Sequence, residues 1–202
     1  MIIGKLKLVA IFILIFGSIY FLERARPMRV FDATGSKVNI ISKAEKARQF
    51  EEAKEISSPD AFINTSGISI GELVGKKVIL IDFWTYSCIN CQRTQPYLNA
   101  WYKKYRDQGL EIIGIHTPEF EFEKKLENVQ EAVRQAGIQY PVALDNDYST
   151  WTAYKNRFWP RKYLIDIDGY IIYDHAGEGA YDETERKIQE ALLERAMRLE
   201  MK

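Results

Sequence analysis

The chain has 202 residues, of which 47% are hydrophobic and 28% are charged. Its 28 lysines and arginines balance its 28 aspartates and glutamates, so the composition lacks the basic excess of a nucleic-acid-binding protein, and we expect no nucleic-acid partner. Two cysteines are too few for a small fold held together by several disulfides. The length fits one domain with an appendage.

Residues 1–29 have the pattern of a membrane or export segment. An apolar run from Leu8 to Leu22 follows Lys5 and Lys7. The run is at the short end of membrane-spanning lengths, for which ~20 residues are usual, but the two lysines can snorkel and lengthen it. Because the residues behind the run offer no small-x-small cleavage site, we favour a retained signal-anchor that crosses the membrane. The flanking basic residues do not decide its orientation.

Residues 30–60 are predicted to form a connector that is partly helical. The stretch 42–56 is rich in Lys, Glu, Ala, Gln and Arg, and Ser57-Ser58-Pro59-Asp60 stops it. The folded domain is predicted over 61–202. We expect a short β-hairpin from residues 61–64 and 67–70 at its start, followed by a helical turn at 71–74.

The remaining elements alternate between strands and helices, and we predict them in this order: strand 78–84, helix 89–108, strand 110–116, helix 121–136, strand 140–144, helix 147–157, strands 161–166 and 170–175, and helix 183–201. The apolar run 78–84 is typical of a buried central strand. Phe122, Leu126, Val129 and Val133 have the spacing of one helical face. The order predicts an α/β fold in which helices cover a mixed sheet with a parallel part and an antiparallel hairpin.

A cysteine pair, Cys88-Ile89-Asn90-Cys91, lies at the turn from the central strand into the next helix. A helix N-terminus presents unpaired N–H groups and the positive end of the dipole, which favour a thiolate at Cys88. Cys91 lies one helical turn further on and can close a disulfide with Cys88. This pattern predicts redox chemistry, in which the Cys88–Cys91 disulfide needs no other cofactor.

The alternative for such a pair is half of a zinc site, which needs two further ligands. The two histidines of the sequence are His116 and His175, and neither belongs to a pair with ligand spacing. We therefore expect no metal.

Five sequence blocks together resemble a thioredoxin-like domain from about Ala61 onwards. They are residues 82–94, 116–120, 140–147, 159–166 and 177–181. The chain is most similar to the extracytoplasmic family related to TlpA and ResA and, within it, to DipZ-like redoxin domains. There are departures: Ser87 stands where thioredoxins usually have Trp, and the dipeptide between the cysteines is Ile-Asn in place of Gly-Pro. No reduction potential can therefore be transferred.

The resemblance implies thiol–disulfide exchange outside the cytoplasm, with the N-terminal segment as a membrane anchor. It favours a reductase of protein disulfides that receives electrons from a separate membrane thiol donor of the CcdA/DsbD type. Cys88 would attack the partner disulfide, and Cys91 would resolve the mixed disulfide.

The resemblance also assigns expectations to residues around the cysteines. Asp82 matches the buried acid of thioredoxin; burial raises the pKa of a carboxyl, so Asp82 can accept the Cys91 proton, although it can also simply bond the neighbouring backbone. Pro160 is expected in cis after Trp159, with the Trp159 backbone available to pair with substrate.

Three further side chains are candidates for the site. His116 and Glu119 follow the strand after the cysteine helix, where carboxyl ends of parallel strands gather, so both are candidates for proton transfer or for structural roles. Tyr86 could belong, with Trp84 and Trp159, to an apolar rim that contacts substrate, although core packing explains Trp84 equally well.

Two other functions remain open at the level of sequence. One is a thiol peroxidase of the peroxiredoxin class, since Thr85 lies three residues before Cys88 as in that motif, although Ile81 stands where its proline belongs. The other is a non-enzymatic assembly factor that presents a thiol to another protein.

Overall fold

The computed structural model describes residues 28–31 and 37–200. Nearly all of the expected anchor, residues 1–29, lies outside these ranges. Within them, no helix is both long enough and apolar enough to cross a membrane. The chain divides into two compact units, Met1–Arg48 and Gln49–Lys202.

The first unit contains an antiparallel pair of strands, β1 (Met28–Phe31) and β2 (Lys37–Ile40), and most of helix α2 (Lys43–Gln49). Ser42 begins this helix, since its side-chain oxygen accepts a hydrogen bond from the Glu45 N–H. The helix ends at Gln49, so the prediction of a helix reaching residue 56 was wrong.

The segment after α2 belongs to the second unit and not to a free connector. The N–H of Ala53 donates to the Gly169 carbonyl, and the N–H of Ile171 donates to the Glu51 carbonyl. A β-bridge joins Glu52 to Tyr170. These long-range backbone hydrogen bonds replace those that a continued helix would have made, and they place the start of the folded unit before residue 61.

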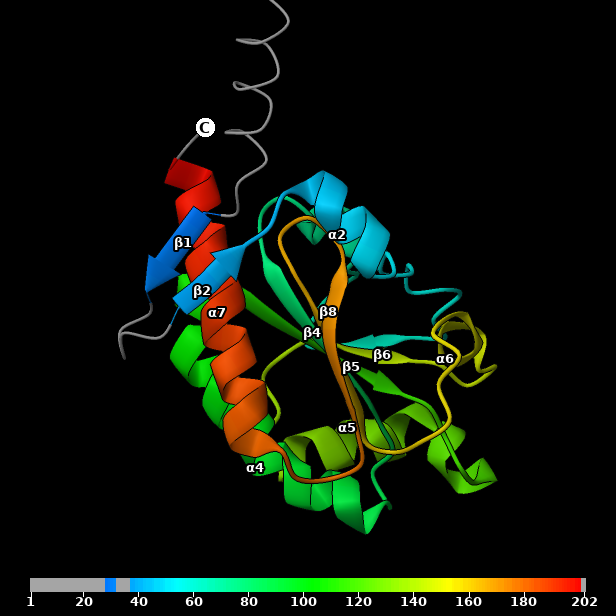
Figure 1. Cartoon of the computed structure of the whole chain (residues 1–202). Coiled ribbons are helices and arrows are strands. Elements are labelled where there is room, and N and C mark those ends of the chain that lie inside the picture. Colours follow the sequence, from blue (N-terminus) through cyan, green and yellow to red (C-terminus); the bar gives the residue numbers. More distant parts are fainter. Residues whose placement is uncertain (1–27, 32–36, 201–202) are drawn as a thin grey trace, which may run out of the picture. The chain divides into compact units, whose positions relative to one another are not determined.

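A mixed sheet of six strands forms the centre of the second unit, in the order β3-β6-β5-β4-β7-β8 (Figure 1). The strands are β3 (Phe62–Ile63), β4 (Val78–Trp84), β5 (Leu110–His116), β6 (Val142–Leu144), β7 (Arg161–Ile165) and β8 (Ile171–Ala176). Strands β4, β5 and β6 are parallel, and the others pair antiparallel with their neighbours. The predicted mixed sheet with its β7–β8 hairpin is confirmed.

The helices of this unit are α3 (Ile70–Leu73), α4 (Ile89–Tyr105), α5 (Leu126–Gln135), α6 (Ser149–Ala153) and α7 (Tyr181–Glu200), with 3-10 turns η1 (Arg106–Gln108) and η2 (Glu121–Lys124). All seven residues of β4 are buried, because helices cover both sides of the sheet. Side chains of α4, α5 and α7 pack with Val78, Leu80 and Trp84 on one side. Residues of α3 and α6 pack on the other side, where Ile79 and Phe83 point.

Two predicted elements near the ends of the sheet and one predicted helix differ from the structure. The hairpin at 61–70 was wrong: β3 pairs with β6, and Ser69 begins α3 by accepting a hydrogen bond from the Glu72 N–H. The helix expected at 147–157 is the short α6, which ends before Lys155, a residue in the left-handed region with φ 50°.

The helix expected at 121–136 is broken at Lys125, whose backbone is extended (φ −74°, ψ 120°). Val129 and Val133 on α5 face the core as predicted, but Phe122 in η2 is 49% exposed. The interruption follows from hydrogen bonding: Glu123 turns its carboxylate back onto the N–H groups of Glu119 and Phe120. Residue Phe122 is thereby removed from the apolar face.

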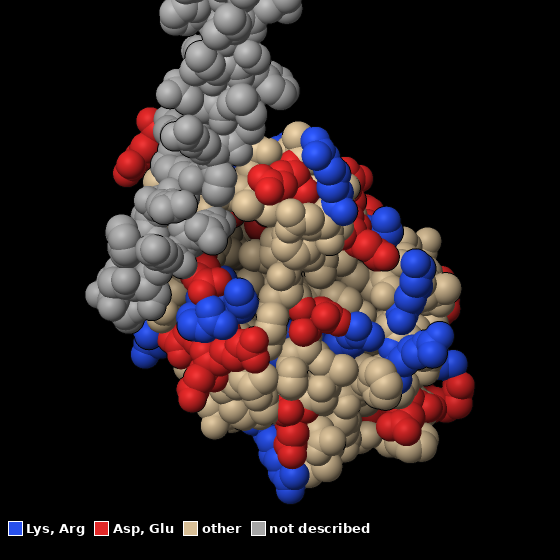
Figure 2. All heavy atoms as spheres, in the orientation of Figure 1, with Lys and Arg blue, Asp and Glu red and all other residues tan. Residues whose placement is uncertain are grey.

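Acidic and basic side chains are interspersed over the face of the described residues seen in Figure 2. This distribution agrees with the balanced charge of the sequence.

Candidate active site

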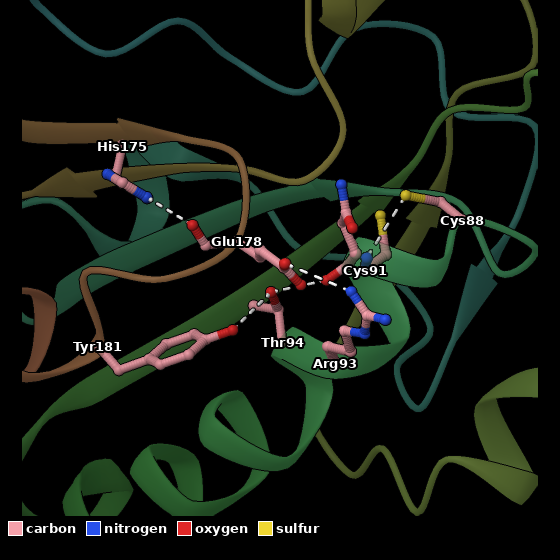
Figure 3. A network of polar contacts seen from close by, with 8 residues as sticks. Cys88, Cys91, Arg93, Thr94, His175, Glu178 and Tyr181 are labelled. Carbon is pink, nitrogen blue, oxygen red and sulfur yellow. Dashed lines mark hydrogen bonds and ion pairs between the residues drawn. The ribbon is translucent and has the colours of Figure 1, made fainter.

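The cysteine pair begins helix α4, and the structure gives its two thiols different surroundings (Figure 3). Cys88 is the N-cap residue, and its Sγ accepts a hydrogen bond from the Cys91 N–H at 3.4 Å. Cys91 lies in the first turn and is only 1% exposed, whereas Cys88 is half-buried. Both cysteines are free thiols, so the structure corresponds to the reduced form of the pair.

These surroundings separate the acidities of the two thiols. A hydrogen bond from the Cys91 side chain, with others from the Cys91 and Asn90 N–H groups, lowers the pKa of Cys88 to about 6 although burial opposes it. Burial raises the pKa of Cys91, and the hydrogen bond to Cys88 raises it further. At neutral pH the accessible thiol is therefore a thiolate and the buried one is protonated.

Asp82 lies on β4 beneath this pair and is 1% exposed. Neither of its carboxylate oxygens has a hydrogen-bond partner among the described residues. Burial raises the pKa of Asp82 to about 7, while the Lys162 ammonium acts to lower it and Cys88 to raise it. The alternative in which Asp82 bonds the backbone is absent from this arrangement, and a carboxyl that titrates near neutrality is suited to proton transfer.

Lys162 was not foreseen from the sequence. It lies on β7 directly across from Asp82 in the antiparallel register, and it is fully buried. Burial lowers the pKa of its ammonium, which the charges of Asp82 and Cys91 act to raise. The signal that could have found it is the strand alternation, since Lys162 shares a face with the buried Leu164.

His116 lies at the end of β5 and is fully buried. Its Nε2 is 3.4 Å from the Thr85 hydroxyl, and its ring stacks on Tyr86 with centroids 5.7 Å apart. Burial lowers the pKa of His116 to about 4, against the opposing charge of Glu123. The imidazole is therefore neutral at physiological pH, which favours a packing role over proton transfer.

Glu119 is exposed in the loop after β5, and its charge acts to raise the pKa of Cys88. Its own N–H donates to Glu123 Oε2 at 2.6 Å. Glu123, a residue that sequence reasoning missed, is fully buried and accepts a hydrogen bond from the Ser87 hydroxyl at 2.6 Å. The carboxylate thereby fastens the loop after β5 to the residue that precedes Cys88.

The peptide bond between Trp159 and Pro160 is cis, as the resemblance predicted. The indole N–H of Trp159 donates to the Thr117 carbonyl at 3.0 Å. Its ring packs on that of Trp151, with the ring centroids 4.3 Å apart. Pro160 offers its carbonyl to the Gly177 N–H. The Trp159 side chain is thus committed to the protein itself.

The aromatic residues on either side of Thr85 have separate positions. Trp84 is 2% exposed and belongs to the core, so of the two alternatives for this residue, a substrate-contacting rim or core packing, the structure supports core packing. Tyr86 is partly exposed, and its hydroxyl donates to the Phe122 carbonyl at 3.3 Å. A pocket of about 440 Å³ opens beside Tyr86, between α4 and α5. It is lined by Trp84, Tyr86, Gln92, Gln95, Pro96, Ala132, Gln135 and Ala136.

The loop after β8 reaches the first turns of α4 (Figure 3). Glu178 forms an ion pair with Arg93 at 3.4 Å, and its carbonyl lies 3.2 Å from His175 Nε2. The Tyr181 hydroxyl lies 3.4 Å from that of Thr94, which in turn donates to the Asn90 carbonyl. These contacts connect the sequence block 177–181 to the cysteine turn.

Comparisons with known proteins agree with this architecture. Residues 43–174 match the AhpC/TSA family. DipZ of Mycobacterium bovis is 48% identical over 143 residues, which is 69% of this chain and 20% of DipZ. The thiol–disulfide oxidoreductase ResA of Bacillus cereus is 33% identical over 122 residues, which is 60% of this chain and 67% of ResA.

The chain thus spans about a fifth of the length of DipZ. Among solved structures, a putative thiol:disulfide interchange protein DsbE from Chlorobium tepidum superposes with a TM-score of 0.63 at 23% identity, over 71% of this chain and 96% of that protein. This likeness shows a thioredoxin-like fold. The chain therefore belongs to the AhpC/TSA family, as a thioredoxin-like member related to thiol–disulfide oxidoreductases.

Proposed function

We propose that the chain is a thiol–disulfide oxidoreductase that reduces protein disulfides with the Cys88–Cys91 pair. The observation that carries this proposal is the asymmetry of the two thiols, one accessible with a lowered pKa and one buried with a raised pKa. Nucleophilic attack on a disulfide requires a thiolate. Keeping the second thiol protonated and buried reserves it for the later, intramolecular step.

The reaction follows from these positions. The Cys88 thiolate attacks one sulfur of the partner disulfide, the other partner sulfur leaves as a thiolate, and a mixed disulfide forms. Cys91 then transfers its proton to Asp82 and attacks the Cys88 sulfur, so that the second partner thiolate is released. Two electrons pass to the partner, and the enzyme is left with a Cys88–Cys91 disulfide. A membrane thiol donor of the CcdA/DsbD type reverses these steps to regenerate the dithiol.

The geometry suggests which other residues face the partner. Tyr86 flanks the cysteine turn with part of its ring exposed. The backbone of Trp159, next to the cis proline Pro160, is the proposed pairing site for the partner chain, since the Trp159 side chain is held by Thr117. We further propose that residues 1–29 anchor the protein in the membrane with the catalytic domain outside the cytoplasm. The apolar run from Leu8 to Leu22 supports the anchor, and the resemblance to extracytoplasmic thioredoxin-like proteins supports the location of the domain.

The direct test is the equilibrium reduction potential of the full-length protein in detergent, measured against dithiothreitol and glutathione buffers. A value near the ~−270 mV of thioredoxin supports a reductase, and a value near the ~−120 mV of DsbA reverses the proposed direction. Replacement Cys91→Ser should accumulate mixed disulfides with substrate proteins, whereas Cys88→Ser should form none. A chain with no reversible two-electron couple would refute the proposal.

The two alternatives are separated by companion assays. The Thr85 hydroxyl lies 3.4 Å from His116 Nε2. Peroxide consumption much faster than that of a free thiol would establish a peroxidase. If the double variant Cys88→Ser/Cys91→Ser still restored the phenotype of a deletion strain, the chain would be a non-enzymatic factor.

A further inference from the structure

The proposed reaction of the two cysteines gives no role to Lys162, which is buried opposite Asp82. These residues are directly opposite each other on β4 and β7, and side chains at such positions lie on the same face with Cβ atoms ~4.5–5.5 Å apart. Both side chains are buried, at 1% and 0% exposure. Burying an ammonium is costly, so a lysine at this position needs a partner that compensates the charge.

The partner that the Lys162 ammonium bonds is a backbone carbonyl. Its Nζ donates to the Gly177 oxygen at 3.2 Å, and it lies 6.0 Å from the centre of the Tyr181 ring. The Gly177 N–H in turn donates to the Pro160 carbonyl, which fixes this loop. The Asp82 oxygens, by contrast, have no hydrogen-bond partner in the described part of the chain. The ammonium therefore acts on the carboxyl by its charge and not through a direct hydrogen bond.

The charged and titratable groups that influence Asp82 come from three neighbouring elements. Lys162 projects from β7, Cys88 and Cys91 from the start of α4, and Tyr140 from the loop before β6. Lys162 is the cation among them. Tyr181, the first residue of α7, also lies near the ammonium, with its ring centre 6.0 Å from Lys162 Nζ.

This separation has a chemical consequence. A direct ion pair would hold Asp82 ionised and make it a poor proton acceptor. A buried carboxyl without a nearby cation would stay protonated, and a protonated carboxyl cannot accept the proton of Cys91. A cation held close by, but bonded elsewhere, leaves both forms of Asp82 accessible near neutral pH.

We propose that Lys162 is a positioning residue for the resolving step: anchored on the Gly177 carbonyl, its ammonium keeps Asp82 able to accept the proton that leaves Cys91 Sγ. The inference rests on the proposed function, because it concerns the same proton transfer. The proton moves from the thiol to a carboxylate oxygen, and the resulting thiolate attacks the Cys88 sulfur.

The test compares Lys162→Met, which removes the charge, with Lys162→Arg, which keeps it. Lys103 is exposed on α4, and Lys103→Met is the matched control for the loss of a positive charge. Two readouts are taken across pH 5–10 on the full-length protein. The first is the carboxyl ¹³C chemical shift of Asp82. The second is the rate at which Cys91 releases thionitrobenzoate from a preformed mixed disulfide on Cys88.

Removing the charge should move the Asp82 titration to higher pH, because Lys162 favours the ionised carboxyl. The pH profile of thionitrobenzoate release should move in the same direction. Release at pH 7 should be about fivefold slower for the first pH unit of the shift and about tenfold slower for each further unit. Lys162→Arg and Lys103→Met should follow the wild-type profile.

An unmoved Asp82 titration in Lys162→Met would overturn the inference, as would a rate that falls equally at every pH. If Lys162→Met does not fold, Lys162→Gln replaces it with the same expectations. Failure of the wild-type protein to release thionitrobenzoate would count against the proposed function, while the Asp82 titration would still decide the role of Lys162.

Discussion

Replacing Glu123 with glutamine should destabilise the protein although it removes no side-chain volume. The Glu123 carboxylate accepts four hydrogen bonds, two at Oε1 from the N–H and hydroxyl of Ser87 and two at Oε2 from the N–H groups of Glu119 and Phe120. An amide has one acceptor oxygen, so its NH₂ must face one of these two pairs of donors. The favourable orientation turns the NH₂ towards Ser87, whose hydroxyl can reverse and accept.

The magnitude follows from that orientation. One bond, from the Ser87 N–H, is lost, and the other three change from charge-assisted to neutral. Hydrogen bonds to charged groups contribute ~1.5–3 kcal/mol and neutral ones ~0.5–1.5 kcal/mol. Allowing for the partial exposure of the loop, Glu123→Gln should lower the free energy of unfolding by about 2–4 kcal/mol.

Urea denaturation at neutral pH measures this loss. The matched control is Glu121→Gln in the same turn, where an exposed ion pair with Lys124 is removed and at most ~1 kcal/mol should be lost. A Glu123→Gln protein as stable as the Glu121→Gln control would refute the hydrogen-bond argument.

The pH dependence provides a second check. Burial acts to raise the pKa of Glu123, but hydrogen bonds from the Ser87 side chain and from the backbone N–H groups of Phe120 and Glu119 bring it below its ordinary value. A depressed pKa in the folded state stabilises the protein above the unfolded pKa of ~4.3 and loses that stabilisation as the pH falls further. The difference between wild type and Glu123→Gln should therefore be constant from pH 7 to about 5 and shrink in more acidic solution.

Three further predictions concern single residues. Alkylation of Cys88 should follow a titration at about pH 6, and Cys91→Ala should move it upwards by removing the hydrogen bond that contributes most to the lowered pKa; a midpoint near the ~8.5 of a free thiol in the wild type would contradict this. His116→Gln should leave the pH profile of disulfide reduction unchanged between pH 5 and 8, because burial lowers the pKa of His116 to about 4; a changed profile near pH 6 would show that the imidazole titrates there. Gly109→Ala should lower the free energy of unfolding by about 1–3 kcal/mol, because φ is +108° and the new Cβ would lie 2.3 Å from an arginine guanidinium of α7; Gly67→Ala, where the added Cβ meets open space, is the control in thermal denaturation.

The central elements of the fold could be predicted because local and tertiary preferences agree there. The apolar run 78–84 becomes a fully buried strand, and Gly109 ends the cysteine helix and its 3-10 extension in the left-handed conformation. The short edge elements could not be predicted. Strand β3 has two residues, and its pairing partner β6 lies about eighty residues further along the chain, so no local pattern encodes it.

The helix expected at 121–136 failed for a different reason. Phe122 has the spacing of the apolar face that Val129 and Val133 form, so periodicity favours one continuous helix. The deciding interaction is the burial of the Glu123 carboxylate against Ser87, which is distant in sequence. A glutamate within an acidic stretch gives no sign that it will be buried.

In the site too, some residues are indicated by local sequence and others only by tertiary contacts. Cys88 and Cys91 are identified by their spacing and by the strand-to-helix turn. Strand alternation indicates that Lys162 shares a face with Leu164, but its position opposite Asp82 depends on the antiparallel register of β7 beside β4, which the sequence does not specify. A lysine in a strand is ordinarily taken to face solvent.

Helix α4 carries a proline, Pro96, at the start of its third turn. Proline has no N–H to donate, so the carbonyl of Gln92, four residues earlier, loses its helical partner, and the ring crowds that carbonyl. The hydrogen-bond ladder of α4 is thus interrupted between the turns before Pro96, which carry the cysteines, and the longer part after it. The residues after Pro96 are held independently of this missing bond, because Leu98, Trp101 and Tyr105 are buried in the core. The proline therefore weakens the backbone connection between the turns that carry the cysteines and the part of α4 that is fixed by packing.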